Sequence, residues 1–347
     1  MTHPRLSLAL EQAPLPEDGT ILVIGALAET DLSDLPKDRL ELVQGFAPDH
    51  AGLSARGFAV SPAPQSSDYA AAVIFLPRAK QEARNALARL CDLVIGGGMI
   101  VVDGAKNDGV DSVLKSLKPL VAPSAAIAKA HGKVFRFAAR RGALADWVVQ
   151  AQTPTEGFVT TPGVFSADKV DAGSALLAQA LPGRLPARLA DLGAGWGWLS
   201  AQILAREGVE TLDLVEADYA ALDCAKRNIT DPRASFHWED VTGYEPAARY
   251  SGIIMNPPFH VGHAGDPNLG QAFIRKAASM LSLSGKLWMV ANRHLPYEDT
   301  LRQVFHHVEE IGGNAQFKLF FAEKPLTKSQ VSKSQAAKAD TQTKRGR

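Results

Sequence analysis

The stretch that decides the fold is Asp191-Leu192-Gly193-Ala194-Gly195-Trp196-Gly197, in which three closely spaced glycines fall between a predicted strand and a predicted helix. The strand ends on Ala190, Asp191 and Leu192. Glycine adopts positive φ readily and lets the backbone approach a ligand closely. The first turn of the following helix offers unpaired N–H groups to polar or anionic ligand atoms. The stretch therefore predicts a ligand-binding turn at the end of a strand.

The spacing of the glycines separates two classes of nucleotide-binding turn. A dinucleotide site has the pattern Gly-x-Gly-x-x-Gly, which would need glycine at Trp198, whereas Gly197 comes one residue earlier. An acid, Asp191, also precedes the first glycine by two positions. This variant resembles the first motif of class I methyltransferases, and an oxidoreductase fails on the spacing. The resemblance implies S-adenosylmethionine as the cofactor. The loop residues that would hold it are Asp191, Gly193, Ala194, Gly195 and Gly197.

Two further acids stand where a nucleoside ligand would need them. Glu216 ends the next predicted strand, and an acidic side chain there can accept hydrogen bonds from both ribose hydroxyls. Asp240 ends the third strand, the place of an acid that contacts adenine. Each could instead be a solvated acid at the end of a strand, and both interpretations stay open. Trp196 and Trp198 are predicted to be packing residues.

A second run with chemical content, Asn256-Pro257-Pro258-Phe259, directly follows the strand predicted at residues 252–255. An exocyclic amine on a base is a poor nucleophile, because its lone pair is delocalised into the ring. Two acceptors aimed at its N–H bonds, the Asn256 amide oxygen and the Pro257 carbonyl, hold the nitrogen and favour a tetrahedral geometry. The prolines fix the turn, and Phe259 offers a face for a flipped-out base. The run predicts methylation of an amino nitrogen, with Asn256 also beside the cofactor.

The predicted reaction needs no general base. The methyl group of a sulfonium is already activated, so catalysis consists mainly of aligning nitrogen, carbon and sulfur. We therefore interpret His260 and His263 as loop or substrate-contact residues rather than as metal ligands. Cys91 and Cys224 lie far apart in no metal-like spacing, which argues against a zinc site or a disulfide framework and fits a reducing compartment.

Strand-like runs alternate with helix-like segments along most of the chain, the pattern of parallel sheets covered by helices. The first half predicts a helix at residues 80–94 and strands at 21–24, 40–43, 72–76, 99–102 and 134–137. The second half predicts helices at about 219–228 and 271–283, and strands at 190–192, 212–215, 235–238, 252–255, 287–290 and 317–321. His306 and His307 are assigned to a surface helix. We predict an α/β protein of two similar domains, joined between Arg141 and Phe165.

Composition is that of a globular protein. The 347 residues, 46% hydrophobic and 21% charged, suffice for two domains with sizeable cores. The formal net charge is zero, so any RNA-binding surface must be local. No apolar run could span a membrane, and residues 1–20 lack the apolar core of a signal peptide. We expect a cytoplasmic monomer.

The stretch from Lys324 to Arg347 is rich in Lys, Ser, Gln and Thr and nearly free of large apolar residues. Such a composition predicts disorder. Its basic residues outnumber its acid, Asp340. A solvated tail and a loose RNA-binding tail both fit this pattern.

From about Thr161 to Lys324, the chain resembles the bacterial 16S ribosomal RNA guanine-N2 methyltransferases of the RsmC type. The resemblance rests on Pro-Gly-Val-Phe-Ser at 162–166 with Asp-Ala-Gly-Ser at 171–174, the glycine loop, Asn-Pro-Pro-Phe-His at 256–260 and Ala-Asn-Arg-His-Leu-Pro-Tyr at 291–297. It implies the N2 amine of a guanine in 16S rRNA as acceptor and ribosomal RNA or the small ribosomal subunit as partner. It also implies substrate contacts from Phe165, Phe259 and His260.

The resemblance further implies two tandem Rossmann-like class I methyltransferase domains, of which the N-terminal one is degenerate and lacks the cofactor site. The chain agrees with this, because the turn after residues 21–24 has one glycine, Gly25, and Phe75-Leu76-Pro77-Arg78 stands where an Asn-Pro-Pro run would fall. The predicted divisions are a degenerate domain at 1–150, a catalytic domain at 151–325 and a basic tail at 326–347.

Two other functions compete with this prediction. The same chemistry could act on adenine N6 or on a protein glutamine amide, but such enzymes more often have Tyr or Trp in place of Phe259, and they lack a decayed twin domain. A non-catalytic RNA-binding assembly factor would not need Asp191, Glu216 and Asn256, all of which are present.

Overall fold

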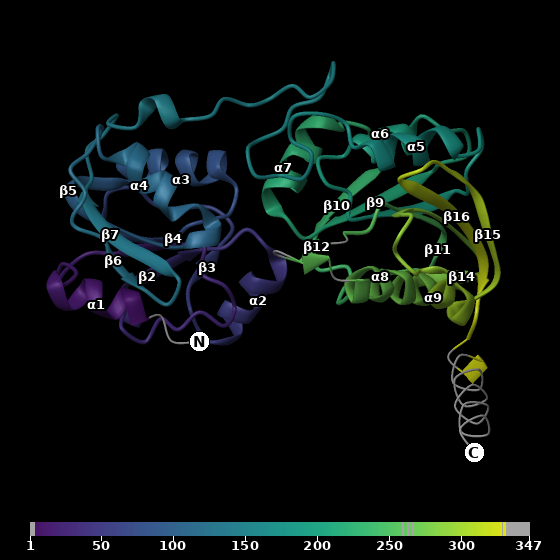
Figure 1. The fold of residues 1–347 in the computed structure, drawn as a ribbon. Helices are drawn as coiled ribbons and strands as arrows, with labels where there is room; N and C mark the ends of the chain where they lie inside the picture. The colour runs from purple at the N-terminus through teal and green to yellow at the C-terminus, as the bar shows by residue number, and fades with distance from the viewer. Residues whose placement is uncertain (1–3, 259, 262–263, 266, 328, 331–347) are drawn as a thin grey trace. The chain divides into compact units, whose positions relative to one another are not determined.

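The computed structural model describes residues 4–258, 260–261, 264–265, 267–327 and 329–330. The chain divides into two compact units, the first formed by Met1–Gln152 with Thr161–Val164 and the second by Thr153–Thr160 with Phe165–Arg347. Each unit is built on its own seven-stranded sheet (Figure 1). Within the described ranges, no helix has the length and apolar character that crossing a bilayer would require.

The first unit packs helices on both faces of a sheet ordered β3-β2-β1-β4-β5-β7-β6. Helices α1 and α2 cover one face, and α3 and α4 cover the other (Figure 1). Its strands are β1 (Ile21–Ile24), β2 (Leu40–Val43), β3 (Val60–Ser61), β4 (Tyr69–Phe75), β5 (Val94–Ala105), β6 (Ile127–Lys129) and β7 (Gly132–Ala138). Its helices are α1 (Pro4–Gln12), α2 (Ala47–Ala55), α3 (Lys80–Leu93) and α4 (Val110–Leu117), with 3-10 turns at Lys37–Arg39, Lys106–Asp108 and Ala145–Trp147.

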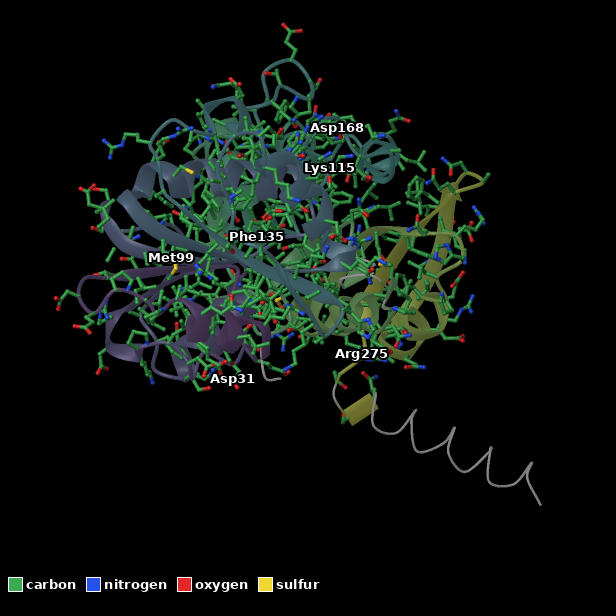
Figure 2. All side chains as sticks on the ribbon, turned by 60° about the vertical axis from the view of Figure 1, so that its left-hand side comes forward. Asp31, Met99, Lys115, Phe135, Asp168 and Arg275 are labelled. Atoms are coloured by element: carbon green, nitrogen blue, oxygen red, sulfur yellow. The ribbon has the colours of Figure 1, made fainter. Side chains whose placement is uncertain are left out.

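Alternation along β1 shows how the sheet divides the core of this unit into two layers. Leu22 of β1 packs with the apolar faces of α3 and α4, whereas its neighbours Ile21 and Val23 pack with α1 and α2. Successive side chains of a strand point to opposite faces, so a strand with helices on both sides is apolar throughout. Phe135 of β7 lies inside the first layer, and Lys115 of α4 is exposed (Figure 2).

The second unit has a sheet ordered β10-β9-β8-β11-β14-β16-β15. Helices α5, α6 and α7 cover one face, and α8 and α9 cover the other (Figure 1). Its main strands are β8 (Arg188–Leu192), β9 (Thr211–Glu216), β10 (Ala234–Trp238), β11 (Tyr250–Met255), β14 (Leu281–Asn292), β15 (Phe305–Gly313) and β16 (Phe317–Pro325). A small ribbon pairs β12 (His260–Val261) with β13 (Ala264–Gly265). Its helices are α5 (Ala172–Ala180), α6 (Trp198–Leu204), α7 (Tyr219–Asn228), α8 (Pro267–Met280) and α9 (Glu298–Val304).

The two sheets share one topology. Counted in chain order among the strands of its own seven-stranded sheet, each sheet places its strands as third, second, first, fourth, fifth, seventh, sixth. The prediction of two tandem Rossmann-like domains is confirmed. The expectation of parallel sheets is wrong at one edge, because β7 pairs antiparallel with β5 and β16 pairs antiparallel with β14.

Three local predictions are corrected. His306 and His307 lie in the edge strand β15, because α9 ends at Val304 and the following backbone pairs with β16. Residues 281–283 begin β14 instead of ending the preceding helix. Lys324 and Pro325 end β16, so no disordered tail begins at Lys324. Residues 328 and 331–347 of the predicted tail lie outside the described residues.

Candidate active site

The glycine loop follows β8 and leads into α6. Gly193, Gly195 and Gly197 have φ values of 76°, 56° and 88°, in the left-handed region that residues with a Cβ rarely adopt. A Cβ at Gly197 would also lie 2.9 Å from Ile229 Cδ1 on the helix-packing side, whereas a Cβ at Gly195 would meet no described atom within 4 Å. Gly197 therefore permits close packing against Ile229, and Gly195 leaves open space beside the loop.

Hydrogen bonds to the next strand, β9, hold this loop in place. The backbone N–H groups of Gly193 and Ala194 donate to the carbonyl of Val215, at 2.8 and 3.2 Å. The Glu216 carboxylate accepts from the N–H groups of Gly195 and Asp218, at 2.7 and 2.8 Å. Burial raises the pKa of Glu216, an effect that these two hydrogen bonds oppose. Glu216, predicted to bind ribose, thus holds the glycine loop in the described structure.

Asp191 and Asp240 occupy different surroundings. Asp191 is 1% exposed, and its carboxyl accepts a 2.6 Å hydrogen bond from the hydroxyl of Ser200 on α6. Burial raises the pKa of Asp191 to about 7; the Ser200 bond opposes this shift and Glu216 adds to it. Asp240 follows β10 and accepts from the N–H and hydroxyl of Thr242, at 2.8 and 2.6 Å, which forms a local turn. Neither lines the cavities described below.

The Asn-Pro-Pro run and the glycine loop meet at the same edge of the sheet. Strands β8 and β11 are parallel neighbours, with Leu192 opposite Met255, so the residues that follow them are adjacent. A Cβ at Gly193 would lie 3.9 Å from Pro258 Cδ and 4.0 Å from the carbonyl oxygen of Asn256. The two motifs that the sequence separates are therefore neighbours in the fold.

The Asn256 side chain is held from one side. Its Nδ2 donates to Asp171 Oδ2 at 2.8 Å and to Ser174 Oγ at 2.9 Å. Asp171 is also the N-cap of α5, since its Oδ2 accepts from the Ser174 N–H at 2.8 Å. In the sequence, both residues stand out only through the family resemblance, which assigns them no role.

A first cavity lies along the glycine loop, with about 440 Å³ of empty space that is partly open to solvent. The cavity is lined by the loop, by Asn256 and by part of the segment that precedes α5. These residues are Phe165, Ser166, Asp171, Ser174, Gly193, Ala194, Gly195, Trp196, Trp198, Leu199 and Asn256.

A second cavity, wider and more open at about 1380 Å³, adjoins the first. Both cavities are lined by Asn256, Asp171, Phe165 and Ser166, and we call these four residues the shared wall. The other lining residues come from the ends of β14 and β16 and the turn between β15 and β16. They are Asn292, Arg293, His294, Ala315, Gln316 and Phe317.

Phe165 stands at this shared wall with 58% of its surface exposed. The buried Trp196 fixes its backbone by donating an indole N–H to the Phe165 carbonyl at 3.1 Å. Trp196 also packs edge-on against Phe158, with ring centroids 5.6 Å apart. The next residue, Ser166, has a φ of 51°, which is unusual for a residue other than glycine and is common at functional sites. An exposed aromatic ring on a braced backbone suits stacking of a base.

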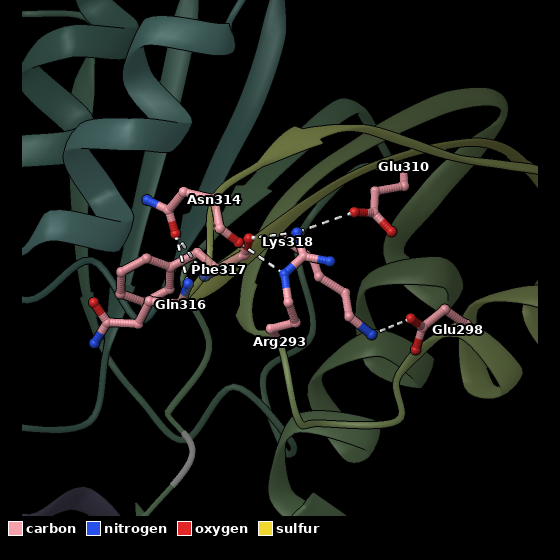
Figure 3. A network of polar contacts seen from close by, with 7 residues as sticks. All are labelled: Arg293, Glu298, Glu310, Asn314, Gln316, Phe317 and Lys318. Carbon is pink, nitrogen blue, oxygen red and sulfur yellow. Dashed lines mark hydrogen bonds and ion pairs between the residues drawn. The ribbon is translucent and has the colours of Figure 1, made fainter.

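Hydrogen bonds and an ion pair hold the turn that borders the second cavity (Figure 3). Asn314 Oδ1 accepts from the N–H groups of Gln316 and Phe317, both at 2.8 Å. Arg293 crosses from β14, donates to the carbonyls of Asn314 and Phe317, and pairs with Glu310 at 3.3 Å. These bonds hold Gln316 and Phe317 at the cavity.

Part of the predicted substrate site lies beyond the described residues. Phe259 and His263 lie outside the described residues, and His260 is described only as backbone in β12. Pro257 is buried and Pro258 is half-buried. Arg293 and His294 belong to a block of family resemblance that assigns them no role, and the sequence did not indicate Gln316 or Phe317 as site residues. The sequence offered no signal for Gln316, since only folding brings its turn beside β14.

The comparisons with known proteins agree with this geometry. Residues 156–321 match the family model described as the methyltransferase small domain, and residues 8–148 match the model of its N-terminal domain. The fold and the site define a class I S-adenosylmethionine-dependent methyltransferase. A ribosomal RNA small subunit methyltransferase C from Shewanella halifaxensis is 31% identical over 269 residues, 74% of this chain and 78% of the relative. The chain belongs to the ribosomal RNA small subunit methyltransferase C family.

Two further relatives extend the comparison. The protein of the same name from Shewanella oneidensis is 29% identical over 74% of this chain and 78% of its own length. The solved structure of the T. thermophilus 16S rRNA N2 G1207 methyltransferase, in complex with AdoMet and guanosine, superposes with a TM-score of 0.76. It is 25% identical and covers 92% of each chain, so the likeness includes both units.

Proposed function

We propose that this protein transfers a methyl group from S-adenosylmethionine to the exocyclic N2 amine of a guanine in 16S ribosomal RNA. The observation that carries the proposal is the position of Asn256 in the wall between two cavities, one along the glycine loop and one large enough for a base. The solved relative holds AdoMet and guanosine, the two ligands that such a pair of cavities requires.

We assign the first cavity to the cofactor. Gly195 leaves free the space that a side chain would fill, and the fastened loop presents backbone rather than side chains to the ligand. Gly193, Ala194, Gly195 and Asn256 would line the bound molecule, with Asp191 and Glu216 holding the loop in shape. When bound, S-adenosylmethionine supplies an electrophilic methyl group on a positively charged sulfur.

The residues of this chain then position the acceptor. The Asn256 amide oxygen and the Pro257 carbonyl accept the two amine hydrogens, which turns the nitrogen lone pair toward the first cavity. Phe165 offers a stacking face at the shared wall, and we assign Phe259 and His260 to the same side of the base. Since no proton need leave before methyl transfer, these residues act by alignment, which can supply several kcal/mol.

The direct test is substitution of Asn256. We expect Asn256→Ala to lower methyl transfer to 16S rRNA by at least about 100-fold, because a preorganised polar group is lost, while the Kd for S-adenosylmethionine stays within about twofold. Transfer of labelled methyl to naked 16S rRNA and to small subunits, followed by nucleoside mass spectrometry, measures this. The matched control is Asn107→Ala, an exposed asparagine of the first unit. Wild-type activity in Asn256→Ala would refute the mechanism.

The same assay separates the competing acceptors. We expect N2-methylguanosine, and we expect it to disappear from the rRNA of cells that lack this protein. Label in N6-methyladenosine or in a protein glutamine would refute guanine as the substrate, but it would still agree with methyl transfer to an amino nitrogen. With ribosomal RNA as acceptor, we place the reaction in the cytoplasm and predict a monomer, which light scattering of the purified protein checks.

A further inference from the structure

The orientation of the Asn256 amide is set by two side chains, Asp171 of the shared wall and Ser174 of the first cavity. Asp171 Oδ2 and Ser174 Oγ lie 2.8 and 2.9 Å from the same end of the amide. A carboxylate has acceptors and no donor, so the atom that faces Asp171 must be the nitrogen. Both N–H bonds of Nδ2 are then used, which leaves Oδ1 for another donor.

We propose that Asp171 and Ser174 are positioning residues that lock the Asn256 amide with Oδ1 toward the acceptor amine. The proposal rests on the proposed function, because it assigns a direction to an amide that accepts from that amine. An amide rotated by 180° would present its own N–H groups to the N–H groups of the base. Such a face of donors cannot hold the amine, so the lock decides which fraction of molecules is competent.

Asp171 has a second role that the experiment must separate. Its Oδ2 also caps α5 by accepting from the Ser174 N–H at 2.8 Å. Asp171→Ser keeps a side-chain cap, since serine is among the favoured N-cap residues, but its shorter side chain withdraws the acceptor from Asn256. Asp171→Asn keeps both the cap of α5 and the acceptor for Asn256, because its Oδ1 can take the place of Oδ2. Ser174→Ala removes the hydroxyl that accepts from Asn256, the weaker of its two partners, and leaves the Ser174 N–H bonded to Asp171.

We expect Asp171→Ser to lower kcat by about 10- to 100-fold with KM for RNA and Kd for S-adenosylmethionine within about twofold, and with an unchanged Tm. Asp171→Asn should recover most of the activity. Ser174→Ala should lose less than Asp171→Ser. The double variant Asp171→Ser/Ser174→Ala should lose less than the product of the two single losses, because an amide that already flips gains little freedom from a second change.

The matched control is Asp168→Ser, which removes an exposed acid three residues earlier and should leave kcat unchanged (Figure 2). A wild-type kcat in Asp171→Ser, or fully multiplicative losses in the double variant, would overturn the inference. So would a loss confined to cofactor affinity, which would make Asp171 a cofactor contact. Failure of the proposed function gives a different result, since the wild-type enzyme itself would then leave guanine in 16S rRNA unmethylated.

Discussion

The carboxyl group of Asp191 is buried on the face of β8 that packs against α6. Its Oδ2 accepts from Ser200, and its Oδ1 has no hydrogen-bond partner among the described residues. A buried carboxylate without full hydrogen bonding is costly, so the protonated form is favoured and the pKa rises to about 7. The group that opens the glycine loop is therefore poised to change charge near neutral pH.

This raised pKa makes a prediction about stability. The folded state holds its proton up to about pH 7, whereas the unfolded chain releases it near the ordinary value of 3.8. Between these values the folded state binds more protons, so stability falls as pH rises, by about 1.4 kcal/mol per pH unit at most. Asp191→Asn removes the titration, so we expect the Tm difference between variant and wild type to shift in favour of the variant from pH 5 to pH 7 and then level off.

Thermal unfolding of the wild type and Asp191→Asn at four pH values between 5 and 8 measures this shift. Ser200→Ala is a useful companion, because it removes the hydrogen bond that lowers the pKa and should extend the loss of stability to a higher pH than in the wild type. A pH-independent difference between Asp191→Asn and wild type would mean that Asp191 does not titrate in this range.

At the residue scale, the sequence predicted the groups that lie at strand ends. Gly193 and Asn256 could be found because a turn after a strand is visible in the chain itself. Asp171 could not be assigned, because its contact with Asn256 joins residues 85 positions apart. Glu216 was placed at the correct edge, but its hydrogen bond to the Gly195 N–H depends on how the loop folds back.

At the scale of elements, β15 shows where a local pattern misleads. Phe305, Val308 and Ile311 recur every third residue, which matches one face of a helix as well as an irregular strand. The structure pairs this segment with β16, and a register shift between Glu310 and Gly312 accounts for the broken alternation. Pairing with a distant strand overrides local periodicity, because the edge of β16 needs hydrogen-bond partners.

Helix α8 is fitted to a buried tyrosine, and this fit gives a prediction. A Cβ at Gly270 would lie 2.0 Å from the hydroxyl oxygen and 2.4 Å from Cζ of Tyr297, which is fully buried. Alanine favours a helix over glycine by up to about 1 kcal/mol, but overpacking a core costs about 1–3 kcal/mol. Since a buried ring cannot move aside freely, we expect Gly270→Ala to destabilise the second unit and lower its Tm.

Denaturant unfolding of Gly270→Ala, monitored by intrinsic fluorescence, measures the change in the stability of the second unit. Ser279→Ala provides the control, because Ser279 is exposed on the same helix. Combining Gly270→Ala with Tyr297→Phe removes the nearest clashing atom and should recover part of the loss. A variant as stable as the wild type would show that Tyr297 can shift.

At the scale of the whole molecule, one topology is used twice with different chemistry. The strand of the first unit that corresponds to β8 is β1, which is followed by Gly25, and β4, which corresponds to β11, is followed by Leu76 and Pro77. The second copy has the glycine loop and Asn256 at the same two places. The repeat of strand order could be expected from the alternating pattern, whereas the antiparallel edges could not, because strand direction there depends on which neighbour the chain reaches.

Each unit also has its own core, and the first is closed by a buried ion pair. Arg5 of α1 donates to Asp103 of β5, with its shortest contact at 2.6 Å, and also to the carbonyls of Lys129 and Ala130. Asp103 is 2% exposed and Arg5 is 8% exposed. Removal of one partner leaves a buried charge uncompensated, which costs about 3–5 kcal/mol. This pair therefore offers a way to weaken one unit alone.

We expect Asp103→Ala to destabilise the first unit while the second unit still binds S-adenosylmethionine with the wild-type Kd. Hydrogen exchange should rise throughout β1, β4 and β5, and calorimetric titration should show unchanged cofactor binding. Asp111→Ala is the matched control, because it removes a half-exposed acid, paired with Lys133, from the same unit. Methyl transfer to RNA should fall in Asp103→Ala only if the first unit contributes to RNA recognition. Loss of cofactor binding together with the first unit would instead mean that the two cores fold as one, since the glycine loop lies wholly in the second.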